Sequence, residues 1–213
     1  MLTAFSVPYM RMADFAHSTG PFKLWKGDEP QRRKFLSTAL EIIESQGCVS
    51  IACAVESAAF NKRKSRLEPL FGNAYLFAAR TAASMAEGYC EDRHLSLPVE
   101  YIFEAGDDRQ DVLRQAMKSE GLPQPIFREK RATDNPLRSV LPLQAADFLA
   151  YELTKGYRDL GRREVRHPLT IFDRMPEKDW GIYEEENMDR LLTINSGVWA
   201  MDRAIGKEKE NKS

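Results

Sequence analysis

Cysteine and histidine are scarce in this chain of 213 residues, which has three of each. The three cysteines are odd in number and show no CxxC spacing, so the sequence argues against a disulfide framework and against a zinc knuckle. The three histidines lie too far apart to form a linear zinc motif. We therefore expect a protein of the reducing cytoplasm.

The sequence also lacks a long apolar run and an excess of charge of either sign. No segment approaches the length of a membrane span, and the N-terminus lacks the basic and apolar regions of a signal peptide. The 31 basic and 32 acidic residues nearly cancel, so the net charge indicates neither a nucleic acid nor a membrane partner. A Gly-rich phosphate loop, a GxSxG motif and a Cys/His nucleophile pair are absent from the sequence as well. We expect no membrane association.

A core of ordinary size can nevertheless form, because 43% of the residues are hydrophobic and 10% are aromatic. Periodicity and turn residues predict helices at residues 30–46, 69–89, 107–120 and 142–154, and strands at residues 49–55, 98–104 and 126–129. Met188, Leu191 and Leu192 indicate one further helix. Strands that alternate with helices predict an α/β domain with helices packed on a small sheet.

We divide the chain into three parts. Residues 1–160 form the domain, residues 161–205 form a C-terminal extension that contains the last helix, and residues 206–213 form a charged, disordered tail. Three strands are few for so much helix. Either a partner chain, such as a second copy in a homodimer, covers an exposed sheet edge, or strands that once preceded residue 1 are absent.

Asp147 is the most unusual residue of the chain, because it lies in an otherwise apolar and alanine-rich helix. Aspartate is unfavourable inside helices, and burial of its charge is costly unless a partner compensates for it. Two interpretations stay open. The residue is a metal-binding or proton-transferring carboxylate whose small neighbours allow close approach, or it is a core acid paired with one of the many arginines.

Two further carboxylates are candidates for the same site. Glu104 ends a hydrophobic strand directly before a glycine turn, and functional groups of α/β sheets gather at the carboxyl ends of strands. Asp14 is expected in a loop that points at the same cleft. The alternatives are that Glu104 leaves the core for water and that Asp14 is an N-cap or a solvated loop acid. Together, Glu104 and Asp147 offer the oxygen ligands that Mg²⁺ or Mn²⁺ requires.

Basic residues form three clusters, at residues 62–66, 128–131 and 158–166. The first is expected in a loop. The second follows Glu104 after one helix, and the third follows Asp147, so both are expected on neighbouring elements. These two clusters are suited to hold phosphate beside the acids, with Arg128 and Lys130 as the candidate phosphate-binding residues. For each cluster the alternative is solvated surface. Trp25 is interpreted as a packing residue and not as a stacking platform for bases.

The segment PLQAADFLAYE at residues 142–152 resembles the signature of domain-of-unknown-function family 3800. YIFEAGD at 101–107 is similar to the strand-plus-acid segment of that family. MRMADF at 10–15, with PFKLW at 21–25, is similar to its Phe-His-Met-x-Asp segment and the tryptophan that follows. The resemblance covers residues 9–160. It implies a ribonuclease-H-like fold, metal-dependent nuclease activity, and Glu104, Asp147 and Asp14 as metal ligands.

The chain departs from the family pattern in two ways. The family opens with a strand that carries Asp-Glu-Ser or Asp-Asp-Ser, which is absent here, and Arg11 stands where the family has histidine. The first-strand aspartate holds the metals in such a site. We therefore expect a ribonuclease-H-like domain with a small mixed sheet that lacks its N-terminal strands, through a deletion, a split gene or a misplaced start codon.

Weak or absent Mg²⁺- or Mn²⁺-dependent cleavage of nucleic acid follows from that expectation. The alternative function is a non-catalytic binding or assembly subunit of a mobile element or phage, whose exposed sheet edge docks a partner. A third is the binding of structured nucleic acid without cleavage.

Overall fold

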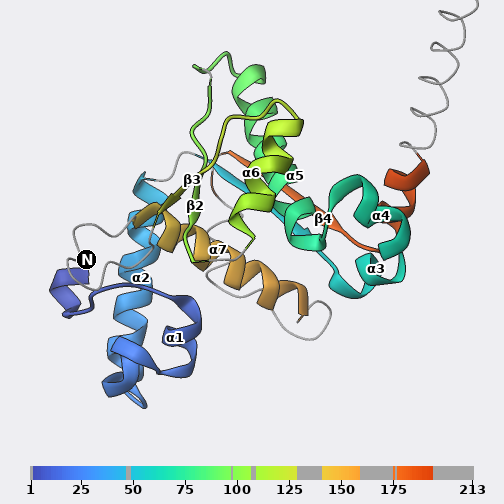
Figure 1. Cartoon of the computed structure of the whole chain (residues 1–213). Helices are drawn as coiled ribbons and strands as arrows, with labels where there is room; N and C mark the ends of the chain where they lie inside the picture. Colours follow the sequence, from blue (N-terminus) through green and yellow to red (C-terminus); the bar gives the residue numbers. More distant parts are fainter. Residues whose placement is uncertain are drawn as a thin grey trace, which may run out of the picture. The chain divides into compact units, whose positions relative to one another are not determined.

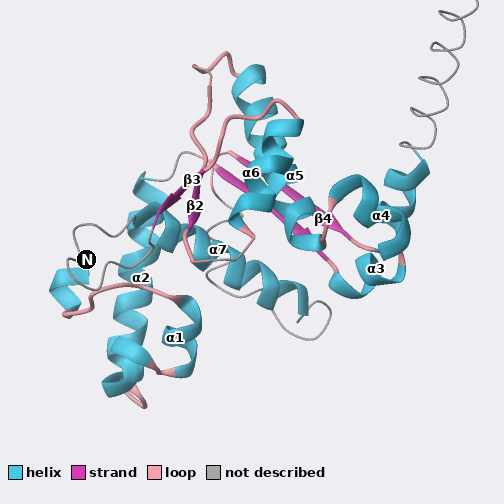
Figure 2. Ribbon diagram, viewed as in Figure 1, coloured by secondary structure: helices cyan, strands magenta, loops and turns pink. Residues whose placement is uncertain are grey.

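The computed structural model describes residues 2–46, 49–96, 98–106, 109–128, 141–158, 175 and 177–193. The described chain is mixed α/β and mostly helical, which Figure 2 shows by colour and which confirms the expected α/β class. It forms two compact units. The first comprises residues 1–52 and 83–180, and the second comprises residues 53–82 and 181–213. These units interleave along the chain, whereas the predicted domain, extension and tail follow one another.

The first unit begins with helical segments, whereas the sequence placed Asp14 in a loop. The 3₁₀ helices η1 (Leu2–Phe5) and η2 (Gly20–Trp25) flank the short helix α1 (Met12–His17), and α2 (Glu29–Gln46) follows. The predicted helix at residues 30–46 is thus confirmed. Its start is fixed by Asp28, whose carboxylate accepts the backbone N–H of Gln31 at 3.1 Å, as expected of an N-cap. Residues 2–25 contain no strand.

Aromatic side chains dominate the core of the first unit. The buried residues of this cluster are Val7, Met10, Met12, Phe15, Phe22, Trp25, Phe35, Ala39, Leu40, Phe148 and Met175. Phe35 of α2 is at its centre, because its ring contacts those of Phe15, Phe22 and Trp25 at centroid separations of 5.6, 5.4 and 5.3 Å. The interpretation of Trp25 as a packing residue is confirmed, since only 7% of it is exposed.

A parallel strand pair and two helices complete the described elements that lie wholly in the first unit (Figure 1). β2 (Ile102–Glu104) pairs with β3 (Ile126–Arg128), and α6 (Gln110–Ser119) connects them, as parallel strands require. α6 buries Leu113 and Met117. α7 (Leu141–Arg158) carries Asp147, as predicted, and contacts both α1 and β2. Within the described residues, no helix is both long and apolar enough to cross a membrane.

A second strand pair joins β1 (Ser50–Val55) to β4 (Lys178–Tyr183). The Ser50 N–H donates to the Glu177 carbonyl and the Glu56 N–H donates to the Tyr183 carbonyl, both at 3.0 Å. Both strands advance together between these bonds, so they run parallel. β4 was not predicted. The expected single mixed sheet is, in the described part of the chain, two separate pairs of parallel strands.

The described part of the second unit, residues 53–82 and 181–193, is helical apart from the ends of β1 and β4. It contains α3 (Ser57–Lys62), α4 (Lys64–Phe71), the start of α5 (Ala74–Asp92) and a helix at residues 185–193. The last of these confirms the helix expected around Met188 and Leu192. The buried core residues of the second unit are Ala59, Phe60, Leu67, Phe77, Met188 and Leu192.

Two predictions for this region are wrong. The basic cluster at residues 62–66 lies at the junction of α3 and α4 and not in a loop. The single helix predicted at residues 69–89 is divided, because Gly72 adopts a φ of +73° at the end of α4. The Asn73 carboxamide oxygen then accepts the Leu76 N–H at 3.0 Å and starts α5. Three predicted features lie outside the described residues: the start of the predicted helix at Asp107 and Asp108, the expected phosphate ligand Lys130, and the tail at residues 206–213.

Candidate functional site

Asp147 lies well inside α7, where it is half-buried and binds the main chain of another element. Its Oδ2 atom accepts the backbone N–H of Met12 at 2.8 Å. The residue is therefore held by a backbone donor from a segment that is 135 positions away in the sequence. The two interpretations from sequence, a metal ligand or the partner of an arginine, both omitted this contact.

Gln144 lies one turn before Asp147 on α7 and also accepts a backbone N–H from the segment that precedes α1. Its Oε1 atom accepts the Met10 N–H at 2.7 Å, and the glutamine is 4% exposed. Sequence reasoning did not select Gln144 as a functional residue. A signal was present, because a long polar amide in an apolar, alanine-rich helix needs a buried partner just as an aspartate does.

Asp14 belongs to the first turn of α1, so the expectation of a loop residue or an N-cap is wrong; Arg11 occupies the N-cap position. Two hydroxyl groups hold the carboxylate. Tyr9 Oη donates to Oδ2 and Thr19 Oγ1 donates to Oδ1, both at 3.2 Å. Gly20 packs directly against this arrangement, as a Cβ there would lie 2.9 Å from Tyr9 Oη and 3.4 Å from Asp14 Oδ2.

Glu104 and Arg128 lie side by side at the carboxyl ends of two parallel strands. They occupy the same register position of the β2–β3 pair, and the Ala105 N–H donates to the Arg128 carbonyl at 2.8 Å. Both residues are exposed. The predicted acid and the predicted phosphate-binding arginine are thus neighbours, at the edge where α/β proteins commonly bind ligands.

Glu104 and Asp147 lie on two elements that contact each other, but the predicted ligands do not form a three-residue cluster. β2, which carries Glu104, contacts α7, which carries Asp147. Across the described residues, however, no three side chains of His, Cys, Asp or Glu lie close enough together to hold a metal ion. A magnesium ion needs only one or two carboxylates, because it keeps several water ligands. Glu104 and Asp147 are sufficient in number for such a site, and Asp14 has separate hydroxyl partners.

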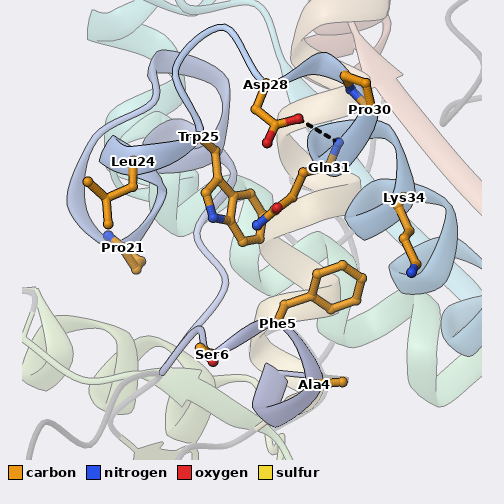
Figure 3. Close-up of a pocket in the computed structure, with 10 residues that line it drawn as sticks. All are labelled: Ala4, Phe5, Ser6, Pro21, Leu24, Trp25, Asp28, Pro30, Gln31 and Lys34. Atoms are coloured by element: carbon orange, nitrogen blue, oxygen red, sulfur yellow. Dashed lines mark hydrogen bonds between the residues drawn. The ribbon is translucent and has the colours of Figure 1, made fainter.

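Two cavities of the first unit have none of these carboxylates in their lining. The larger, about 720 Å³, is shown in Figure 3, where Trp25 and Phe5 face the cavity and Lys34 of α2 lies at its side. The smaller, about 290 Å³, is lined by Ala145 and Ala146 of the segment before Asp147, together with Leu149 and Met175. The small side chains of Ala145 and Ala146 therefore border open space beside α7.

The basic cluster at residues 62–66 has acidic partners. Arg63 binds Asp189 through two hydrogen bonds of 2.6 Å, and it also reaches Glu185 at 3.1 Å. Lys62 Nζ lies 2.8 Å from Glu185 Oε2. These contacts hold the pKa values of Asp189 and Glu185 below their ordinary range. Lys62 and Arg63 thus pair with two acids of the helix at residues 185–193, whereas the alternative from the sequence was solvated surface.

Comparisons of the chain with family models, with curated proteins and with solved structures gave no match. The resemblance to family 3800 therefore rests on the motifs at residues 10–15, 101–107 and 142–152 alone. The ribonuclease-H-like fold and the nuclease activity that it implies are proposals.

Proposed function

We propose that the chain is a ribonuclease-H-like protein related to metal-dependent phosphodiesterases, with its site at the carboxyl ends of β2 and β3. The observation that carries the proposal is the register of Glu104 and Arg128 at that edge, together with the contact between β2 and α7. An acid beside an arginine can bind a metal and the phosphate that the metal neutralises.

In this proposal Glu104 and Asp147 hold Mg²⁺ or Mn²⁺, and Arg128 contacts a phosphate oxygen. The metal would supply an activated water and stabilise the leaving oxygen. The protein's own side chains bind the metal and orient the phosphate. The planar guanidinium of Arg128 offers paired N–H donors that match phosphate geometry, and its exposure leaves it accessible to a substrate.

Metal binding is the first test. Full-length protein is titrated with Mn²⁺ and with Mg²⁺, and binding is followed by calorimetry and by the rise in Tm. We expect both signals in the wild type, with their loss in Glu104→Gln and in Asp147→Asn. Glu100→Gln is the matched control, because Glu100 is an exposed glutamate just before β2. If the wild type shows no metal-dependent signal, the proposed site is refuted.

Cleavage is the second test, with labelled single- and double-stranded DNA and RNA as substrates. The proposed site offers the metal two carboxylates, Glu104 and Asp147, so we expect at most weak Mn²⁺-dependent cleavage that EDTA stops. Arg128→Gln should weaken substrate binding without changing metal binding. Robust cleavage that Asp147→Ala abolishes would refute the expectation of weak activity and strengthen the assignment of the site.

A second candidate function is non-catalytic binding or assembly through a sheet edge. In the described part of the chain β2 pairs with β3 alone, and Ile102 of β2 is 39% exposed. Exposed strand edges pair readily with other chains. This function predicts a stable homodimer or complex whose mass, measured by light scattering, falls on Ile102→Lys and does not respond to EDTA. A monomeric wild type that cleaves nucleic acid would contradict it.

A further inference from the structure

Gln144 and Asp147 bind two alternate peptide groups of one extended segment. Met10 donates its N–H to Gln144, and Met12 donates its N–H to Asp147. Between them, Arg11 has φ −134° and ψ 122°, an extended conformation. In an extended chain, backbone groups two residues apart point to the same side. On α7, residues three positions apart lie on the same face. The two spacings match.

The side chains of Met10 and Met12 are buried, while the N–H groups of these two residues bind α7. Met10 is 3% exposed and Met12 is 2% exposed, and both belong to the aromatic core of the first unit, whereas Arg11 is exposed. The segment is thus held in two ways, by apolar packing and by main-chain hydrogen bonds. Gln144 and Asp147 bind peptide N–H groups, so these two hydrogen bonds do not depend on the side chains at positions 10 and 12.

We propose that Gln144 and Asp147 form a backbone clamp that fixes residues 10–12 on α7 and thereby positions Asp14. The Met12 N–H has no acceptor inside α1, since it lies in the first turn. Asp147 supplies that acceptor from another helix. Asp14 follows two residues later, where Tyr9 and Thr19 hold its carboxylate. This inference does not rest on the proposed function, because the clamp acts with or without a metal.

The clamp assigns a role to the carboxylate that differs from metal binding and can be separated from it. Asparagine keeps one side-chain oxygen that accepts a hydrogen bond, but it has no negative charge. Asp147→Asn therefore preserves the clamp and removes the anionic ligand. Asp147→Ala removes both. Gln144→Leu removes the other acceptor with little change in volume.

The test is amide hydrogen exchange in ¹⁵N-labelled full-length protein, read at the backbone N–H groups of Met10 and Met12. Loss of one hydrogen bond of ordinary strength predicts roughly tenfold faster exchange. We expect this increase at Met10 in Gln144→Leu and at Met12 in Asp147→Ala, while Asp147→Asn stays within about twofold of the wild type. Thr154→Ala is the matched control on α7, because its hydroxyl bonds to Ala150 within the same helix.

Three outcomes would overturn the proposal: no acceleration at Met12 in Asp147→Ala, no acceleration at Met10 in Gln144→Leu, or equal acceleration in Asp147→Asn and Asp147→Ala. If Asp147→Ala does not fold, Asp147→Asn decides, since the clamp requires that it folds with a protected Met12 N–H. A folded, protected Asp147→Asn that no longer binds Mn²⁺ would support the clamp and the metal site together. If the wild type itself binds no Mn²⁺ and Asp147→Asn is folded and protected, the clamp is supported and the metal site is refuted.

Discussion

The hydroxyl of Tyr9 lies 2.9 Å from the point at which a Cβ on Gly20 would stand. Gly20 also adopts a φ of +54°, in the left-handed region that side chains disfavour. Glycine is thus favoured here for two independent reasons, beside the carboxylate of Asp14 that Tyr9 and Thr19 bind.

We expect Gly20→Ala to lower the free energy of unfolding by about 1–3 kcal/mol, because it adds contact strain to backbone strain. The measurement is urea denaturation. Gly27→Ala is the control, since Gly27 has a φ of +83° but a Cβ there would meet no atom of the described chain within 4 Å. Tyr9→Phe in the Gly20→Ala background should recover part of the loss; no recovery would show that the hydroxyl is not the obstacle.

The ion pairs of Arg63 predict a stability that depends on pH. Hydrogen bonds from Arg63 lower the pKa of Asp189, and those from Lys62 and then Arg63 lower the pKa of Glu185. Carboxylates with depressed pKa values in the folded state stabilise it above their ordinary pKa and lose that contribution as the pH falls through the folded-state value. The window therefore lies below the ordinary values of 4.5 for Glu185 and 3.8 for Asp189.

Arg63→Gln should accordingly lower the Tm at pH 7, and the difference from the wild type should shrink as the pH is reduced to about 3. Thermal scans across this range provide the measurement. Arg190→Gln is the control, because Arg190 makes an exposed pair with Glu186 on its own helix, and such pairs contribute little. A difference that stays constant with pH would show that Arg63 acts through packing alone.

Cys53 should be an unreactive thiol. Burial raises its pKa to about 11, against a smaller opposite effect of the hydrogen bond with Thr81. At pH 8 about one molecule in a thousand then carries the thiolate that reacts with alkylating reagents. In a Cys48→Ser/Cys90→Ser background, labelling by iodoacetamide should be negligible at pH 8 and become rapid on unfolding in urea. Rapid labelling of the folded protein would contradict the raised pKa of this half-buried thiol.

Phe148 should be one of the most sensitive positions of the first unit. It is fully buried on α7 and belongs to the aromatic core. Phe148→Ala is expected to lower the free energy of unfolding by about 3–5 kcal/mol, through lost burial and a new cavity. Leu24→Ala, at a leucine that is 92% exposed, should change it by less than about 0.5 kcal/mol. Equal losses in both variants, measured by denaturation, would contradict the assigned core.

Long elements with a regular apolar pattern could be predicted from the sequence. α2 has Phe35, Ala39 and Leu40 on one buried face, and α6 and α7 were located in the same way. Short elements could not. α1 spans only six residues, and helices of that length depend on tertiary contacts such as the bond from Met12 to Asp147. β4 was missed because its sequence KDWGIY has no alternating apolar pattern.

For the candidate site, residue type and position were informative but partners were not. The predicted position of Glu104 at the end of a strand is confirmed, and Arg128 occupies the same register position on the neighbouring strand. The sequence also showed that Asp147 needs compensation. It could not show that a peptide N–H provides it, because any residue except proline has that donor and no side chain marks which one is used.

The second unit is assembled from two stretches that are distant in the chain. Its core joins Phe60 and Phe77 to Met188 and Leu192. Contacts between residues so far apart in the sequence carry a high cost in loop-closure entropy, which slows folding. A chain that stops before residue 181 lacks Met188 and Leu192, so it leaves the apolar side chains of Phe60 and Phe77 without these core neighbours.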